Sequence, residues 1–152
     1  MMNGWSSKQF KDLEAQELWA ILRLRQEVFV LEQECLYGDI DDSDPHAQHL
    51  SFWVDGTLHA YARLLAPGIS YKQASIGRVV VAPTARSSKL GTELMQHAIR
   101  EVEALYPTHE IKIGAQKYLE NFYKRLGFET ISDVYIEDGI PHIHMLKKAI
   151  ET

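Results

Sequence analysis

The chain has 152 residues, of which 45% are hydrophobic and 24% charged. These values predict one folded domain over residues 1–152 and exclude a disordered chain; a disulfide framework is excluded because Cys35 is the one cysteine. The formal net charge of −5 argues against a nucleic-acid or membrane-surface binder. The polar N-terminus shows no signal-peptide pattern and no segment is long and apolar enough to span a membrane, so we expect a soluble, cytoplasmic protein.

Hydrophobic periodicity predicts the elements of the N-terminal half. A helix is expected over Asp12–Leu31, with a break near Gln26, because its apolar residues follow an imperfect helical stripe. Two strands are expected over His49–Val54 and Thr57–Leu65. They are joined by Asp55-Gly56, a dipeptide typical of a two-residue hairpin turn.

The second half of the chain alternates strands and helices. The strands expected there are Ala74–Ala82, Glu110–Gly114, Phe128–Glu137 and Ile143–Lys147, and the helices are Ser87–Leu105 and Lys117–Leu126. Gly127 indicates the end of the last helix, and Asp138–Pro141 indicates a turn. A hairpin followed by alternating strands and helices predicts an α/β domain, with a mixed, twisted sheet flanked by helices on both faces.

A phosphate-binding turn is predicted where the strand ending at residue 82 leads into a helix. The first N–H groups of a helix are unpaired and lie at the positive end of its dipole, so they favour an anion. Arg86 and Lys89 add positive charge there, and Gly91 allows a ligand to approach the backbone closely. The hydroxyl donors in the same run are Ser87, Ser88 and Thr92. The glycine patterns of Rossmann folds and P-loops do not occur.

The run Arg86–Gly91, RSSKLG, resembles the acetyl-CoA motif of the GCN5-related N-acetyltransferases, the GNAT family, with Lys89 in place of the first motif glycine. Gln116–Phe128, QKYLENFYKRLGF, resembles the second motif of that family and follows about 30 residues later. Leu24–Asp42 and Asp138–Met145 resemble the ElaA-like branch in particular. The resemblance therefore covers nearly the whole chain.

The resemblance implies a GNAT domain that uses acetyl-CoA as acetyl donor and no metal. It implies that the amides of Arg86–Thr92 hold the pyrophosphate, and that Gln116 flanks the pantetheine arm. It also implies that Tyr123 donates a proton to the leaving thiolate, because a phenol pKa near ~10 lies close to that of a thiol; a core aromatic is the alternative. Backbone N–H groups near Val79 or Val80 would bind the oxyanion. The cofactor-binding residues expected are Val79, Val80, Val81, Arg86, Ser87, Ser88, Lys89, Leu90, Gly91, Thr92, Gln116 and Tyr123.

The implied reaction is transfer of an acetyl group from acetyl-CoA to a primary amine of a small molecule or a protein, by direct attack in a ternary complex. Two alternatives stay open. Lys89 at a glycine position would suit a non-catalytic acyl-CoA sensor, and His142 with His144 would suit a metal-dependent hydrolase. Cys35 is expected to be a buried, inert thiol rather than an acyl carrier. The sequence names no acceptor and does not choose between a monomer and a homodimer.

The acceptor side is less clearly marked. The residues expected there are Arg25, Glu32, Gln33, Arg78 and His142. Arg25 or Glu32 could instead form internal ion pairs, and Arg78, inside an apolar strand, must either meet an anionic substrate or pair with an acid. The candidates for the general base are Glu34, Asp41, His142 and His144. An acidic loop could attract a cationic amine or be merely solvated; its carboxylates are Asp39, Asp41, Asp42 and Asp44.

Overall fold

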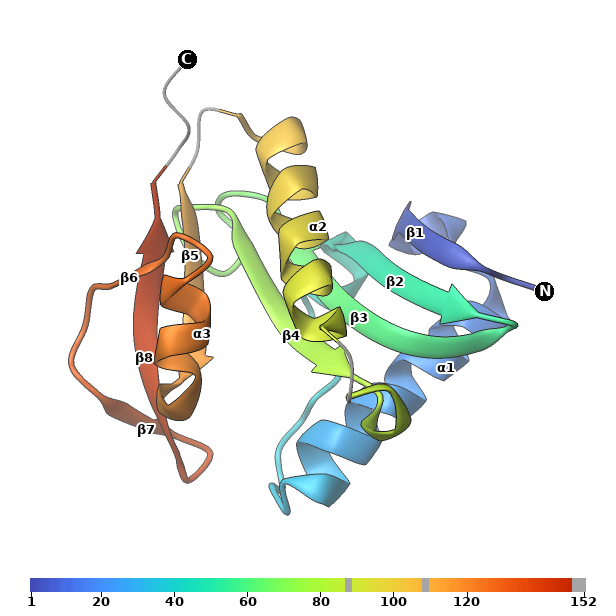
Figure 1. The fold of residues 1–152 in the computed structure, drawn as a ribbon, viewed down its shortest axis with the longest axis horizontal. Helices are drawn as coiled ribbons and strands as arrows, with labels where there is room; N and C mark the ends of the chain where they lie inside the picture. The colour runs from blue at the N-terminus through green and yellow to red at the C-terminus, as the bar shows by residue number, and fades with distance from the viewer. Residues whose placement is uncertain (87–88, 108–109, 149–152) are drawn as a thin grey trace.

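The computed structural model describes residues 1–86, 89–107 and 110–148. Its strands are β1 (Gly4–Gln9), β2 (Gln48–Val54), β3 (Thr57–Leu65), β4 (Ser75–Val81), β5 (Ile111–Gln116), β6 (Glu129–Thr130), β7 (Tyr135–Glu137) and β8 (Ile140–Lys147). Its α-helices are α1 (Ala15–Arg25), α2 (Leu90–Leu105) and α3 (Glu120–Lys124). The strands form one sheet in the order β1-β2-β3-β4 and a second in the order β5-β8-β6, with β7 also paired to β8 (Figure 1).

The hairpin between β2 and β3 is confirmed. Val54 pairs with Thr57, so the turn consists of Asp55 and Gly56, whose φ angles are +47° and +78°. Two consecutive left-handed residues match the right-handed twist of the flanking strands, and aspartate and glycine are residues that adopt this conformation at low cost.

Strand β1 was not expected from the sequence. Its residues, GWSSKQ, are mostly polar, yet they pair antiparallel with β2, Trp5 opposite Phe52 and Ser7 opposite Leu50. The Trp5 ring lies 4.7 Å from that of Phe52 and 4.0 Å from that of His97 on α2. An edge strand of this kind depends on backbone pairing and on the packing of a single tryptophan, so periodicity does not reveal it.

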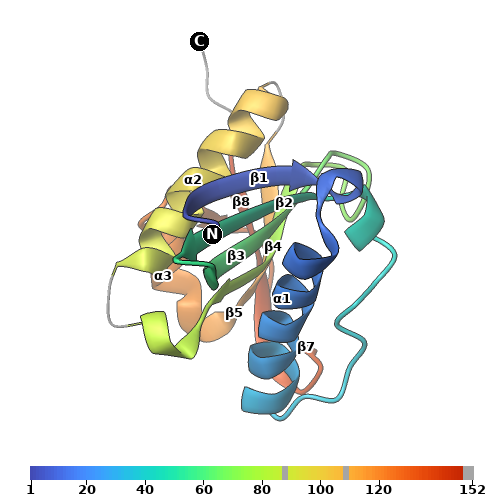
Figure 2. The same ribbon diagram turned by 90° about the vertical axis from the view of Figure 1, so that its right-hand side faces the viewer.

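Helices cover both faces of the first sheet, as predicted (Figure 2). On one face Ile21 and Leu24 of α1 pack with Tyr61 and other buried residues. On the other face α2 contributes Leu94 and Ala98 to a larger core, which also includes buried residues of β5, α3 and β8. Because α2 packs on both sheets, it joins the two halves of the molecule.

The expected break in the first helix is confirmed at Gln26. The α-helix ends at Arg25 and continues as a π-helical segment, Gln26–Glu32. Ile21, Leu24 and Val28 are buried in the same core, so the π-helical segment continues the buried face of α1. The N-terminus of α1 is stabilised by a capping box, in which the side chains of Glu14 and Glu17 each accept a hydrogen bond from the backbone N–H of the other residue.

The second sheet differs from the expected strand pattern. The region Phe128–Glu137 forms two short strands, because Thr130 pairs with Met145 but Tyr135 pairs with His142. Thr130 and Tyr135 are five residues apart, whereas their partners on β8, Met145 and His142, are three residues apart. The residues between Thr130 and Tyr135 therefore leave the ladder. The turn shortens to residues 138–139, and β8 begins earlier than expected, at residue 140.

Among the described residues, no helix combines the length and the apolarity needed to cross a membrane.

Candidate functional site

β4 and β5 run parallel, touch at one end and separate toward the other. Ala74, just before β4, forms an isolated parallel bridge with Ile111, and the N–H of Lys112 donates to the Ala74 carbonyl at 2.9 Å. Beyond this point no strand in the described part of the chain pairs with the outer edge of β4. Figure 1 shows the two strands diverging from that contact. β4 therefore has a free edge with which an extended ligand can pair.

The direction of the free peptide groups follows from one hydrogen bond. The N–H of Ala82 donates to the His59 carbonyl of the hairpin at 2.8 Å, so it points toward β3. Peptide groups alternate in direction along a strand, which turns those of Val81 and Val79 to the free edge. The Val81 carbonyl does face away from β3, because it accepts a hydrogen bond from Nε of Arg86 at 3.2 Å.

A cavity of about 310 Å³ lies beyond the end of β4, at the N-terminus of α2. It is lined by Val81, Arg86, Lys89, Gly91, Thr92 and Phe122. Five of these were expected from the sequence; Phe122 was missed, although it stands beside Tyr123 in the second motif. Ser87 and Ser88 lie outside the described residues. We call this cavity the cradle.

Two other residues expected to bind the cofactor have buried side chains, so only their backbone groups can contact a ligand. Val80 is 4% exposed and packs on the α1 side of the first sheet, while Leu90 is 5% exposed and packs in the larger core. Their side chains stabilise the strand and the helix that flank the cradle, and so they can contribute to ligand binding only through main-chain groups.

Arg86 is held at the mouth of the cradle by Glu32. The guanidinium donates two hydrogen bonds to the carboxylate, at 2.9 and 2.7 Å, and these bonds lower the pKa of Glu32. Each side chain is 43% exposed, so the pair is a surface ion pair, not the internal one considered from the sequence. Exposed pairs of this kind contribute little stability, so Arg86 can exchange Glu32 for an anionic ligand at low cost.

Gln116 and Gln33 approach each other at the separated ends of the sheets. Nε2 of Gln116, at the end of β5, donates to Oε1 of Gln33 at 3.4 Å. Close by in the chain, the buried thiol of Cys35 donates to the carbonyl of Asp138 at 3.3 Å, which confirms its expected burial. Glu34 between them is exposed, with φ of +50°. The segment after α1 thus contacts the second sheet directly.

Tyr123 lies in the larger core. It is 7% exposed and its ring contacts those of Phe122 and Phe128 edge-on, with centroids 5.1 and 6.0 Å away. Its hydroxyl forms no hydrogen bond with any residue that the structure describes. Burial raises the pKa of Tyr123 to about 12. This value is further from that of a thiol than the sequence suggested, so the hydroxyl is better suited to donating a hydrogen bond to a thiolate than to releasing its proton.

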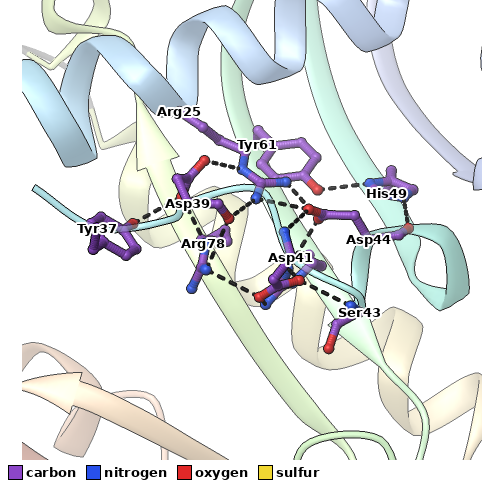
Figure 3. Close-up of polar contacts among 10 residues, drawn as sticks. Arg25, Tyr37, Asp39, Asp41, Ser43, Asp44, His49, Tyr61 and Arg78 are labelled. Atoms are coloured by element: carbon purple, nitrogen blue, oxygen red, sulfur yellow. Dashed lines mark hydrogen bonds and ion pairs between the residues drawn. The ribbon is translucent and has the colours of Figure 1, made fainter. Parts of the chain in front are cut away.

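The expectation that Arg25 faces substrate is wrong. Its side chain is 0% exposed, and its guanidinium donates to the carboxylates of Asp39, at 2.9 Å, and of Asp44, at 2.7 and 3.1 Å (Figure 3). An arginine buried this completely must be paired, which is why an internal ion pair prevailed.

The carboxylates of the acidic loop also form ion pairs with arginines. Asp41 accepts from Arg63 at 2.6 Å, and Arg63 also donates to Asp44 at 3.0 Å. Arg78 pairs with Asp39 at 2.9 Å and with Asp41 at 3.2 Å. The members of this network, which we call the loop network, are Arg25, Asp39, Asp41, Asp44, Arg63 and Arg78. Three carboxylates balance three guanidinium groups, so the attraction of a cationic amine by these carboxylates loses its basis. Asp42 is exposed and outside the network.

Arg63 and two tyrosines of this region were missed. Tyr37 donates to Asp39 at 2.8 Å and its ring lies 5.6 Å from the Arg78 guanidinium. Tyr61 donates to Nδ1 of His49 at 2.7 Å, because the other ring nitrogen of His49 must donate to the carbonyl of residue 44. Arg63 had the same sequence signal as Arg78, a charge inside an apolar strand.

His142 and His144 lie on one face of β8, next to Tyr135. Nδ1 of His142 donates to the Ile140 carbonyl at 2.7 Å, and its Nε2 lies 3.6 Å from Glu137. The His144 ring lies 4.7 Å from that of Tyr135, and burial lowers the pKa of His144. In the described chain no group of three or more His, Cys, Asp or Glu side chains could hold a metal ion. A second open cavity, of about 710 Å³, lies between α1 and residues 37–40 and shares no lining residue with the cradle.

The loop network predicts a loss of stability in acid. Burial alone would raise the pKa of Asp44, but hydrogen bonds from Arg25, the Asp41 N–H and Arg63 outweigh it and lower the pKa from 3.8 to about 2. Ionised Asp44 stabilises the folded state fully at pH values above its unfolded pKa of 3.8. The free energy of unfolding therefore falls by about 2 kcal/mol as the pH is lowered to below 2, where Asp44 is protonated in the folded state as well. Urea unfolding at pH 5 and pH 2.5 measures this loss. Equal slopes of stability against pH in wild type and Asp44→Asn would contradict it.

Residues 9–149 match the family model described as an acetyltransferase (GNAT) domain. The chain is 38% identical to Protein ElaA of Escherichia coli, over 99% of each chain. The chain therefore belongs to the GNAT acetyltransferase family, in its ElaA-like branch, and the resemblance drawn from the sequence motifs is confirmed.

Solved structures agree with this assignment. An acyl-CoA N-acyltransferase from Pseudomonas aeruginosa superimposes with a TM-score of 0.90, at 43% identity, covering 94% of this chain and 97% of the other. The crystal structure of E. coli ElaA gives a TM-score of 0.90 at 38% identity, covering 97% of this chain and 100% of the other. An aminoglycoside 6′-N-acetyltransferase complexed with coenzyme A shares the fold, with a TM-score of 0.71 at 16% identity.

Proposed function

We propose that this protein transfers the acetyl group of acetyl-CoA to a primary amine, by direct attack in a ternary complex. The observation that carries the proposal is the free edge of β4, which leads directly into the basic cradle at the start of α2. Few other ligands combine an extended amide-bearing arm with a pyrophosphate. The fold class and the family membership support the acyl transfer itself.

The chain's own groups account for binding. The peptide groups of Val79 and Val81 would pair with the amides of the pantetheine arm as an added strand does. The first N–H groups of α2, with Arg86 and Lys89, would hold the pyrophosphate. Lys89 stands where the family motif has a glycine, but its side chain is exposed and lines the cradle, so it adds charge there without filling the site.

Catalysis needs a neutral amine, a stabilised oxyanion and a stabilised leaving group. The amine nitrogen bonds to the acetyl carbon as the carbon–sulfur bond breaks, and the amine loses a proton to water or to a base. The Val79 N–H would bind the developing oxyanion, and Tyr123 would donate a hydrogen bond to the departing thiolate. His142 and His144 are retained as candidates for the base. Asp41 is not, because its carboxylate already accepts hydrogen bonds from Arg63 and Arg78.

A regulatory sensor that binds acyl-CoA without turnover is the second candidate, and Lys89 at the glycine position favours it. The two differ in steady-state release of free CoA in the presence of amines. We propose a cytoplasmic protein that acts as a monomer or homodimer on a small-molecule or protein amine.

Replacing Arg86 with alanine is expected to weaken the binding of CoA and of acetyl-CoA about tenfold, because a charge-assisted hydrogen bond to phosphate contributes about 1.5–3 kcal/mol and part of it is offset by the lost Glu32 pair. Calorimetric titration measures both affinities. Arg100→Ala, an exposed arginine further along α2, is the matched control and should bind as wild type does. Equal weakening in both variants would indicate a nonspecific charge effect, and no binding by wild type would reduce the assignment to the fold alone.

A further inference from the structure

We propose that Arg78 is a positioning residue for acyl transfer. Its ion pairs with Asp39 and Asp41 hold a bulge in β4, and the bulge sets the direction of the Val79 N–H. The inference rests on the proposed function, since it concerns the backbone group assigned there to the oxyanion.

The bulge is visible in the pairing of β4 with β3. Tyr61 pairs with Val80 but Arg63 pairs with Gly77, so two residues of β4 stand opposite one residue of β3. Arg78 is one of the two, and its φ is +49°. A non-glycine residue in this left-handed conformation is strained, because its Cβ crowds the backbone. Other contacts must therefore stabilise this conformation.

The bulge decides which way β4 faces. Ile76 packs in the core on the α2 side, whereas Val80 packs in the core on the α1 side. Residues four apart on a regular strand point to the same face, so the extra residue must reverse the alternation between them. Without it, the valines after Arg78 would exchange faces, and the peptide groups that meet the free edge would change as well.

The side chain of Arg78 is held at three points. Its Nε lies 2.9 Å from Oδ1 of Asp39, and its Nη2 lies 3.0 Å from the Asp39 carbonyl and 3.2 Å from Oδ2 of Asp41. Figure 3 shows it beneath the loop, between Asp39 and Asp41. The guanidinium group therefore attaches the bulge to the acidic loop.

The loop can hold the bulge because it is itself fixed to two other elements. Arg25 binds Asp39 and Asp44 from α1, and Arg63 binds Asp41 and Asp44 from β3. Asp39 and Asp44 are 7% and 4% exposed, so the contacts that these two carboxylates make are shielded from solvent. The bulge is thus stabilised from outside β4, by groups that do not contact the free edge.

The test uses Arg78→Gly and Arg78→Lys in the full chain. Glycine adopts a positive φ without strain, so Arg78→Gly removes the ion pairs while the backbone can still adopt the bulge conformation. We expect kcat for CoA release to fall about tenfold or more. The Kd for free CoA should rise by a smaller factor, because the cradle still holds the pyrophosphate although the pairing of Val79 with the pantetheine arm is weakened. Lysine keeps the charge but not the fork of donors, and should restore part of kcat.

Lys8→Ala is the matched control, because it removes a partner of the buried Glu17, 2.8 Å away, far along the chain from β4. It should lower stability without changing kcat. If kcat falls in both Lys8→Ala and Arg78→Gly, in proportion to the stability that each variant loses, the inference is overturned. A raised KM for the amine with unchanged kcat would also overturn it, because Arg78 would then be an acceptor contact.

A separate readout keeps this test apart from the proposed function. Hydrogen exchange at the amides of Val80 and Ala82, which face β3, should accelerate in Arg78→Gly and largely recover in Arg78→Lys, whether or not wild type turns over. Wild type that binds acetyl-CoA but releases no CoA with any amine would refute the proposed function alone. Unchanged exchange at these amides in Arg78→Gly would refute the positioning role alone.

Discussion

Replacing Asp44 with alanine is expected to lower the free energy of unfolding by about 3–5 kcal/mol, the range measured when one partner of a buried ion pair is removed. Asp44 is 4% exposed and accepts hydrogen bonds from Arg25, Arg63 and the N–H of Asp41. Its loss leaves a guanidinium with 0% exposure short of a counter-charge. Urea unfolding at pH 7 measures the change.

Asp42→Ala provides the control within the same loop. Asp42 is exposed and belongs to no ion pair among the described residues, so its replacement should change stability by less than about 0.5 kcal/mol. A loss below 1 kcal/mol in Asp44→Ala would mean that water or a loop rearrangement compensates Arg25, and the loop network would not be the anchor inferred from the geometry.

Replacing Tyr123 with phenylalanine is expected to lower kcat about 10- to 100-fold, because a hydrogen bond to a charged group contributes about 1.5–3 kcal/mol. Stability should change little, since Tyr123 is 7% exposed and its hydroxyl makes no hydrogen bond with the described residues. Steady-state CoA release and thermal unfolding measure the two effects. The raised pKa, about 12, also predicts that no fall in rate below pH 11 arises from this phenol.

Tyr106→Phe is the matched control for that experiment. Tyr106 packs against the same core at the end of α2, away from the cradle, so kcat should be unchanged. Wild-type kcat in Tyr123→Phe would assign Tyr123 to core packing with Phe128 and leave the thiolate to be stabilised by other groups.

Contiguous signals in the sequence predicted much of the fold and the cradle. The Asp55-Gly56 turn depends on two neighbouring residues, and the stripe of α2 depends on spacing within one helix. The cradle could be located for the same reason, since Arg86 and Gly91, which both line it, are only five residues apart in the chain. Strand β1 and the split of Phe128–Glu137 were not predictable, because both depend on pairing with distant strands.

The sequence by itself determined the family, the helices and strands with strong periodicity, and the position of the cradle. Only the tertiary structure decided which partners the isolated arginines bind. Arg25, Arg63 and Arg78 are far apart in the sequence. The first two are buried and the third is partly buried, so each needs a counter-charge, but which aspartate it meets depends on how α1, β3 and β4 surround one loop. Burial determines that a charge must be paired, and chain topology determines with which partner.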